Sequence, residues 1–313
     1  MPLVLVLLLI TASLLTDTFA TPANLIGVAR QISFEALIAF GMTLIIITGG
    51  IDLSVGSLVA LTGVIAAMVM NATLDAPPAI CISLGMAAGC GVGALSGTLS
   101  GLVVTRFAVP PFIVTLAAML IARGFAFISC SGQPIYELPQ ELLYWGRGFV
   151  LEDTIGRVLP VPVLLLIIGF VVFHVLLSRT IYGRRVVAVG SNEEAARLAG
   201  IPVRRTRLIA YTLTGGLCGI VGLLLDAKLM AGDPKVGEMW ELNVIAAVVV
   251  GGTSLFGGRG TIVGTLIGAL IIGVLNNSLN LMHVDHFWQK VVLGLVILGA
   301  ALLDSALRRL GRQ

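Results

Sequence analysis

The sequence predicts an all-α, polytopic membrane protein with about ten transmembrane helices, and three observations support this fold class. First, 58% of its 313 residues are hydrophobic and only 11% are charged, whereas soluble domains carry about 25% charged residues. Second, short polar breaks separate long apolar runs, which is the pattern of membrane-spanning helices. Third, the runs do not alternate polar and apolar residues, as the roughly ten-residue strands of a β-barrel would.

The predicted spans follow one another along the chain. The first has no Lys or Arg ahead of its apolar run, so we interpret it as a membrane helix, with a secretory signal peptide as the alternative. The fourth is rich in Gly and Ala, and small residues let membrane helices approach closely. The eighth is short. The ten ranges are 3–20, 32–49, 57–70, 79–104, 112–130, 161–178, 208–227, 242–256, 261–282 and 288–304.

Lysine and arginine favour the cytoplasmic side of a membrane, so the charged loops predict the orientation. Ten spans place both termini on one side, and the C-terminal tail carries Arg308, Arg309 and Arg312. Both termini are therefore predicted to be cytoplasmic, with nine or eleven spans as the alternatives. The same count places the arginine-rich loop 179–207 in the cytoplasm and the acidic loop 131–160 outside.

Several functional classes lack their sequence signals in this chain. It has no GxxxxGK[ST] phosphate loop, HExxH or GxSxG motif, so we expect no ATPase site of its own and no enzyme activity. Loop 179–207 contains no DNA- or RNA-binding motif, so we expect no nucleic-acid partner. The four cysteines form no CxxC pair or Cys/His cluster, so we expect no metal and no cofactor bound by this chain.

The loop 179–207 contains a predicted helix of about two turns. Ser191 and Glu194 have the spacing of a capping box, in which each side chain bonds the backbone amide of the other. Gly200 tolerates the left-handed conformation in which many helices end, so we predict a helix over residues 192–199. Two turns are unstable alone in water, so this helix must pack on its own protein or on a partner. Its small apolar face holds Ala195, Leu198 and Ala199.

Part of this helix resembles a known docking motif. The letters EAA at residues 194–196, with Gly200 four residues later, resemble the EAA loop of ABC importer permeases. In that family the loop forms a coupling helix that docks on a cytoplasmic ATPase. The resemblance implies an ATPase-coupling role for Ser191, Glu193, Glu194, Ala195, Ala196, Leu198 and Gly200.

A second motif makes the resemblance more specific. Residues 48–57, TGGIDLSVGS, resemble the signature of bacterial carbohydrate permeases of the ribose, xylose, arabinose and galactofuranose group, and residues 241–268 resemble the same group. The resemblance covers nearly the whole chain and implies a single transmembrane permease domain, 1–313, in the bacterial inner membrane. It implies import of a monosaccharide that a periplasmic sugar-binding protein delivers. It also implies a second permease copy or homologue and an ATPase subunit that binds ATP-Mg.

Glycine-rich segments interrupt the predicted spans at residues 49–57 and 251–260. Glycine weakens a helix, and irregular backbone at membrane depth is stable when it is buried in protein or lines an aqueous cavity. Asp52 and Ser54 are expected either to cap the third span or to line a pathway or gate. The candidate pathway residues in the two breaks are Gly49, Gly50, Asp52, Ser54, Gly56, Gly251 and Gly252.

Polar side chains within the predicted spans are few. Glu35 and Asp226 are expected near span ends, in contact with interfacial water. This scarcity of ionisable groups disfavours the alternative function, an ion-coupled secondary transporter of a small polar solute. Amide side chains offer donors and acceptors that suit a neutral, hydroxylated solute, and hydrogen bonds between helices are the other interpretation. The amides near the outer end of the ninth span belong to Asn276, Asn277 and Asn280.

Overall fold

The structure is a computed structural model that describes residues 1–150, 152 and 158–310. Asp153 and Arg157 of the acidic loop and Arg312 of the tail lie outside the described residues. Helices dominate the described chain. The longer ones are α1 (Pro2–Leu15), α2 (Pro22–Ile47), α3 (Val55–Ala72), α4 (Pro78–Phe107), α5 (Pro111–Ser129), α8 (Val161–Arg179), α9 (Ile181–Ser191), α11 (Val203–Leu229), α12 (Trp240–Val250), α13 (Ile262–Leu281) and α14 (His286–Leu310).

The shorter elements lie in the two long polar loops. The loop after α5 contains η1 (Gln140–Leu142), α6 (Leu143–Arg147) and an antiparallel pair of strands, β1 (Phe149–Val150) and β2 (Leu159–Pro160). The arginine-rich loop contains α10 (Glu193–Leu198) after α9. These two groups of short elements mark the two ends of the molecule.

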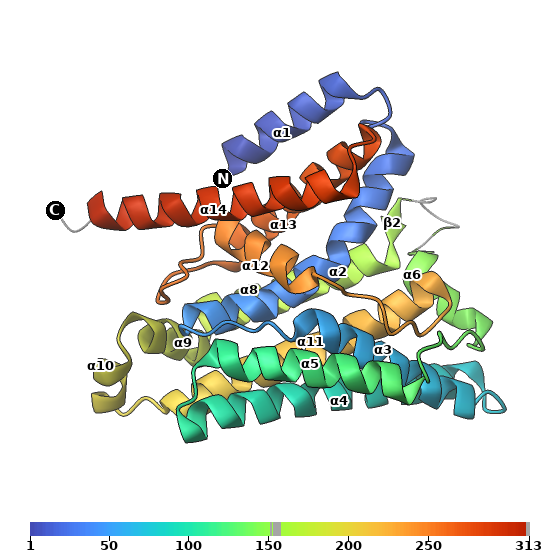
Figure 1. Ribbon diagram of the computed structural model, residues 1–313, viewed down its shortest axis with the longest axis horizontal. Coiled ribbons are helices and arrows are strands. Elements are labelled where there is room, and N and C mark those ends of the chain that lie inside the picture. Colours follow the sequence, from blue (N-terminus) through green and yellow to red (C-terminus); the bar gives the residue numbers. More distant parts are fainter. Residues whose placement is uncertain (151, 153–157, 311–313) are drawn as a thin grey trace.

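Helices α3, α4, α5 and α11 run along the long axis of the molecule (Figure 1). Helices α9 and α10 lie at one end, which we call the α10 end, and the last turns of α14 point the same way. Helix α6 and strand β2 lie at the opposite end, which we call the hairpin end. The loops predicted on opposite sides of the membrane therefore lie at opposite ends of the fold.

Helix α2 begins ten residues before the predicted start of the second span at residue 32. Thr21 adopts extended backbone and its hydroxyl accepts a bond from the amide of Asn24, while Pro22 occupies the first turn. These are helix-starting features. The predicted start of this span was wrong, because Asn24, Arg30 and Gln31 lie inside a continuous helix. The first span likewise ends earlier, at Leu15, and the eighth ends at Val250.

Helices α2 and α11 form the core of the fold. Nearly every residue of α2 from Ile32 to Ile47 is buried, and α11 is buried along most of its length. A helix that is apolar on all sides is stable when other helices surround it. Helix α11 packs against α4, α3 and α2, and α2 also packs against α13 and α8.

Small residues bring α4 and α11 into backbone contact, as the sequence predicts. Gly93 and Gly215 face each other so closely that a Cβ on either would collide with the other's carbonyl oxygen. The hydroxyls of Thr98 and Thr212 bond across the same interface at 2.8 Å. Close packing and hydrogen bonds of this kind hold membrane helices together where hydrophobicity does not.

A methyl group at Gly93 should destabilise this interface. Gly93→Ala is expected to lower the unfolding free energy by about 1–3 kcal/mol, the range for overpacking, because α4 and α11 must separate. Thermal unfolding in detergent measures this as a lower apparent Tm. Gly91→Ala on the same helix is the control, since a Cβ there meets no atom within 4 Å. Equal Tm values for the two variants would contradict the close contact.

The described helices confirm an all-α, polytopic membrane protein. Seven of them are long and apolar enough to cross a membrane. Three further apolar helices are shorter, at Pro2–Leu15, Trp240–Val250 and Phe287–Gly299. They fall at the first, eighth and tenth predicted spans, so the count of ten spans and the location of both termini stay predictions.

Candidate functional site

Helix α10 begins at a different cap from the one predicted. The side chain of Asn192 accepts a bond from the amide of Ala195 at 3.0 Å. The prediction that Ser191 is the cap is wrong, because Ser191 is the last residue of α9 and its hydroxyl donates to the carbonyl of Val187. A cap residue needs extended backbone, and Asn192 has it, with φ of −158°.

The end of α10 follows the prediction. Gly200 has a φ of +75°, in the left-handed region. Its amide donates to the carbonyl of Arg197, and the amide of Ile201 donates to the carbonyl of Ala196, both at 3.0 Å. This is the Schellman arrangement, in which glycine is the usual residue because its backbone adopts the left-handed conformation readily. Space is not the reason, since a Cβ at Gly200 meets no atom within 4 Å.

Helix α10 has one face on its own chain and one face free. Ala196 is buried and packs with Val189 and Val203 in a small apolar cluster. On the other side Ala195 is exposed and Leu198 is 85% exposed. The helix is therefore held in place by its own chain while it presents an apolar residue to solvent.

Helix α9 fixes the position of α10 against the core. Thr180 caps its start by accepting a bond from the amide of Gly183. The hydroxyl of Tyr182 donates to the carbonyl of Thr206 at 3.1 Å, and burial raises the pKa of this phenol well above its usual range. The phenol therefore stays protonated and keeps this bond. At the other end of α9, Gly190 packs directly on the backbone of Ile47.

The first glycine-rich break is the irregular segment between α2 and α3. Gly49 has a φ of +81°, which ends α2. Asp52 is only 2% exposed and accepts two bonds from Ser54, from its amide at 2.9 Å and from its hydroxyl at 2.6 Å. Ser54 occupies the N-cap position of α3, as one of the two expectations had it, but its side chain makes no cap bond because its hydroxyl donates to Asp52. Gly56, in the first turn of α3, packs on the carbonyl of Gly237.

The second break, between α12 and α13, lies against the first. Gly252 has a φ of +91°, and Gly251 packs on the backbone of Gly264 in α13. Farther along, the amide of Gly258 donates to the carbonyl of Ile47 at 2.9 Å. The end of α2, helix α9 and the second break thus meet at the carbonyl of one residue.

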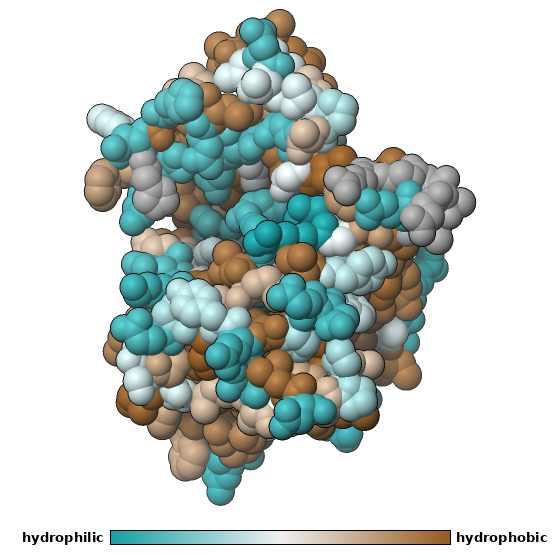
Figure 2. Space-filling view, turned by 90° about the vertical axis from the view of Figure 1, so that its right-hand side faces the viewer, coloured by the Kyte–Doolittle hydropathy of each residue, from teal (hydrophilic) through white to brown (hydrophobic). Residues whose placement is uncertain are grey.

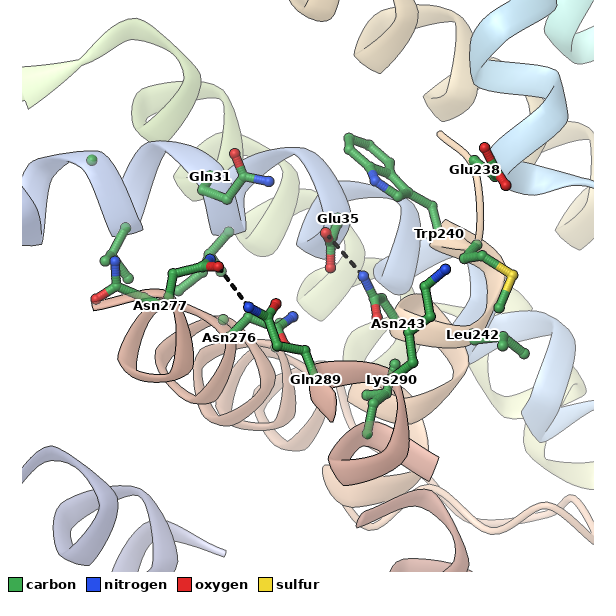
Figure 3. Close-up of a pocket in the computed structure, with 18 of the residues that line it drawn as sticks. Gln31, Glu35, Glu238, Trp240, Leu242, Asn243, Asn276, Asn277, Gln289 and Lys290 are labelled. Carbon is green, nitrogen blue, oxygen red and sulfur yellow. Dashed lines mark hydrogen bonds between the residues drawn. The ribbon is translucent and has the colours of Figure 1, made fainter. Parts of the chain in front are cut away.

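A cavity of about 770 Å³ lies between α2, α12, α13 and α14. Figure 2 looks at the hairpin end and shows polar residues on both sides of a hollow there. In Figure 3, Glu35, Asn243 and Asn276 lie around this cavity on three different helices. The polar residues that line it are Asn24, Gln31, Glu35, Glu238, Trp240, Asn243, Asn276, Asn277, Asn280, Gln289 and Lys290.

Some of these amides already bond each other across helices. Asn24 and Asn277 exchange two bonds of 3.0 Å between α2 and α13. The amide of Asn243 donates to Glu35 at 3.3 Å. Among the described residues none is recorded as a hydrogen-bond partner of the Asn276 side chain. The cavity therefore combines paired amides, which hold the helices, with amide groups that have capacity for a solute.

The structure separates the predicted pathway residues into three groups. The three asparagines of α13 line the cavity. Gly49 lines a second cavity, of about 860 Å³, next to α10. The remaining residues line neither cavity: Gly50, Asp52, Ser54, Gly56, Gly251 and Gly252. The first four are buried and Gly251 packs on the backbone of Gly264, whereas Gly252 is exposed.

Residues 24–301 match the model of a family described as the permease component of the branched-chain amino acid transport system. The chain belongs to this permease family. It is 45% identical to the ribose import permease protein of Bacillus subtilis, over 96% of this chain and 90% of that protein. It is 42% identical to the ribose import permease protein of Escherichia coli K12, over 96% and 91%. It is 37% identical to the L-arabinose transport system permease protein of the same strain, over 97% and 89%. No solved structure matches significantly.

Two acidic residues of the permease lie elsewhere than expected. Glu35 lines the cavity in the middle of α2, because α2 starts at Pro22. Asp226 is 1% exposed, although it is close to the end of α11. The expectation of contact with interfacial water is therefore wrong for Asp226.

The sequence contains a signal for the cavity face of α2. Asn24, Gln31 and Glu35 are seven and four residues apart, which places them on one side of a helix. These three residues can be recognised as one face of a helix only when α2 is known to start at Pro22.

With its apolar helices, the permease is a multi-pass protein of the bacterial inner membrane.

Proposed function

We propose that this permease is the membrane subunit of an ATP-driven importer that moves a monosaccharide across the inner membrane. The amide-lined cavity carries the proposal. Its volume of about 770 Å³ falls within the range of small-molecule sites, about 300–1,000 Å³. The similarity to ribose and arabinose permeases over almost the whole chain supports the same function.

The cavity chemistry favours a sugar over an amino acid. Each carboxamide offers two donors and an acceptor with two lone pairs, which match the hydroxyls of a neutral sugar. The indole of Trp240 adds an apolar surface with an N–H donor. A branched-chain amino acid has an apolar side chain without hydroxyls, so it would leave the amides that α2, α12 and α13 bring to this cavity without matching groups. The Asn276 amide, with Asn243 across the cavity, is the site we expect a hydroxyl to contact.

The energy for transport comes from a partner in this proposal. The sequence lacks a phosphate loop, so ATP-Mg is bound by a separate ATPase subunit. That subunit docks at the α10 end, on the face that carries Ala195 and Leu198. A periplasmic sugar-binding protein delivers the solute at the hairpin end, and a second permease copy or homologue completes the membrane unit.

Reconstitution in proteoliposomes tests the proposed function. The permease is combined with its ATPase and binding protein, and uptake of labelled ribose is measured with and without ATP. We expect uptake that requires ATP hydrolysis and the binding protein. Uptake that instead follows a proton or sodium gradient without ATP would identify an ion-coupled secondary transporter and overturn the proposal.

Filling the cavity should block transport without disturbing the fold. Gly27 lines the cavity, and a Cβ on it meets no atom within 4 Å. Gly27→Trp is therefore expected to leave expression unchanged and to lower sugar uptake by at least about tenfold, since an indole takes up much of a small-molecule site. Gly124→Trp on α5 is the control, because Gly124 is equally open but lies outside the cavity. Normal uptake by Gly27→Trp would exclude this cavity from the pathway.

A further inference from the structure

Helix α11 presents two polar side chains to the first glycine-rich break. Arg207 and Tyr211 are four residues apart, so they lie one turn apart on the same face. Arg207 donates from Nε and Nη2 to the carbonyl oxygen of Thr48, at 3.3 and 3.2 Å. Tyr211 places its hydroxyl beside Gly50, where a Cβ would lie 2.6 Å from it. One face of α11 therefore follows the segment from Thr48 to Gly50.

Arg207 also reaches the predicted coupling helix. Its Nη2 donates to Oε2 of Glu193, the first residue of α10, at 2.8 Å. The Arg207 side chain is only 22% exposed. Glu193 has a second ion pair, with Arg197, but that arginine is 71% exposed, and exposed pairs contribute little. The partly buried guanidinium thus joins α10 to the carbonyl end of α2.

Tyr211 carries a polar group with no partner. The residue is 1% exposed, and its hydroxyl has no hydrogen-bond partner within the described chain. Buried hydroxyl groups are nearly always bonded, because an unpaired one loses its water without compensation. Asp52 lies in the neighbouring segment, and both bonds from Ser54 end on its Oδ1. Carbonyl and carboxylate oxygens able to accept a bond are therefore present in the segment that Tyr211 faces.

We propose that Arg207 and Tyr211 are positioning residues that transmit movement of α10 to the Thr48–Ser54 segment. The inference rests on the proposed function. When the ATPase moves α10, Thr48 moves too, because the guanidinium of Arg207 is bonded both to Glu193 and to the carbonyl of Thr48. The displaced segment brings an oxygen within reach of the Tyr211 hydroxyl, which is unpaired in the state described here. The hydrogen bond gained stabilises the conformation that the transporter adopts after α10 has moved.

Tyr211→Phe separates this role from a packing role. Phenylalanine keeps the ring and removes only a hydroxyl that is unpaired in this state, so the apparent Tm is expected to stay or to rise. The ATP-dependent uptake rate is expected to fall about five- to tenfold, the factor for one hydrogen bond. Unchanged uptake would overturn the inference. Wild-type protein without ATP-dependent uptake would instead be a failure of the proposed function.

A second experiment substitutes Arg207 and measures the number of ATP molecules hydrolysed for each sugar molecule transported. Arg207→Gln is expected to raise this ratio at least about threefold while the ATPase still co-purifies, and Arg207→Lys is expected to restore part of the coupling through its charge. Arg205→Gln, at an exposed position two residues earlier, is the matched control with an unchanged ratio. The inference is wrong if Arg207→Gln leaves the ratio unchanged, or if it acts only by releasing the ATPase.

Discussion

Leu198→Asp is expected to release the ATPase from the permease while the membrane domain stays folded. Leu198 is 85% exposed on α10, so the change should have little effect on the isolated permease. In the proposed complex it places a carboxylate in a buried apolar contact. Disrupting a central interface residue costs about 2–4 kcal/mol, which corresponds to an affinity weaker by about 30- to 700-fold at about 1.4 kcal/mol per tenfold. Co-purification of the ATPase in detergent measures the loss.

Leu198→Met is the matched control for this experiment, because it keeps an apolar side chain of similar volume. It should retain the ATPase. Ala196 is unsuitable for the test, since it is buried against Val189 and Val203 and a charge there would displace α10. Full retention of the ATPase by Leu198→Asp would mean that α10 is only a surface helix resting on its own chain.

The sequence predicted local features best where one residue type decides the conformation. Gly200 predicted the end of α10, because few other residues adopt a φ of +75° there. The start of α10 was predicted one residue early. Ser191 and Asn192 are both good caps, and the choice depends on where α9 ends. That end is set by packing of α9 on the core, which a local pattern does not contain.

Contacts between distant segments were beyond the sequence pattern. Arg207 lies 14 residues from Glu193 and 159 residues from Thr48, and no periodicity relates the three. The asparagines of α13 were identified because several amides in one apolar helix are unusual. Their partner Asn24 lies 253 residues away, in a turn that the predicted second span left out.

The role of the glycine-rich breaks could not be predicted from their composition alone. Composition predicted irregular backbone at both breaks, and the structure has it at Gly49 and Gly252. Lining a pathway was one of two expectations for these residues. Gly56 and Gly251 instead allow backbones to touch, and Gly257 and Gly258 bring the loop after α12 against the end of α2 and against α9. This junction joins the α10 end to the helix that lines the cavity.

Gly190→Ala should therefore have one of the largest effects on transport of any single methyl group. A Cβ at Gly190 would collide with the carbonyl of Ile47 and lie 2.6 Å from the amide of Gly258. Both neighbours are backbone, so α9 must move away from the end of α2. We expect the unfolding free energy to fall by about 1–3 kcal/mol. We also expect uptake to be slower by at least about tenfold, which corresponds to about 1.4 kcal/mol in the activation free energy of transport. Thermal unfolding and uptake in proteoliposomes measure the two effects.

Gly216→Ala in α11 is the control, because it adds the same methyl group where no atom lies within 4 Å. Alanine is favoured over glycine inside a helix, so its Tm should stay or rise. Wild-type uptake by Gly190→Ala would show that α9 can withdraw from Ile47 without consequence. If Gly190→Ala lowers uptake but not Tm, the junction acts in transmission and contributes little to folding. A loss of both, with the ATPase still bound, is the result expected of a rigid contact through which α9 moves the end of α2.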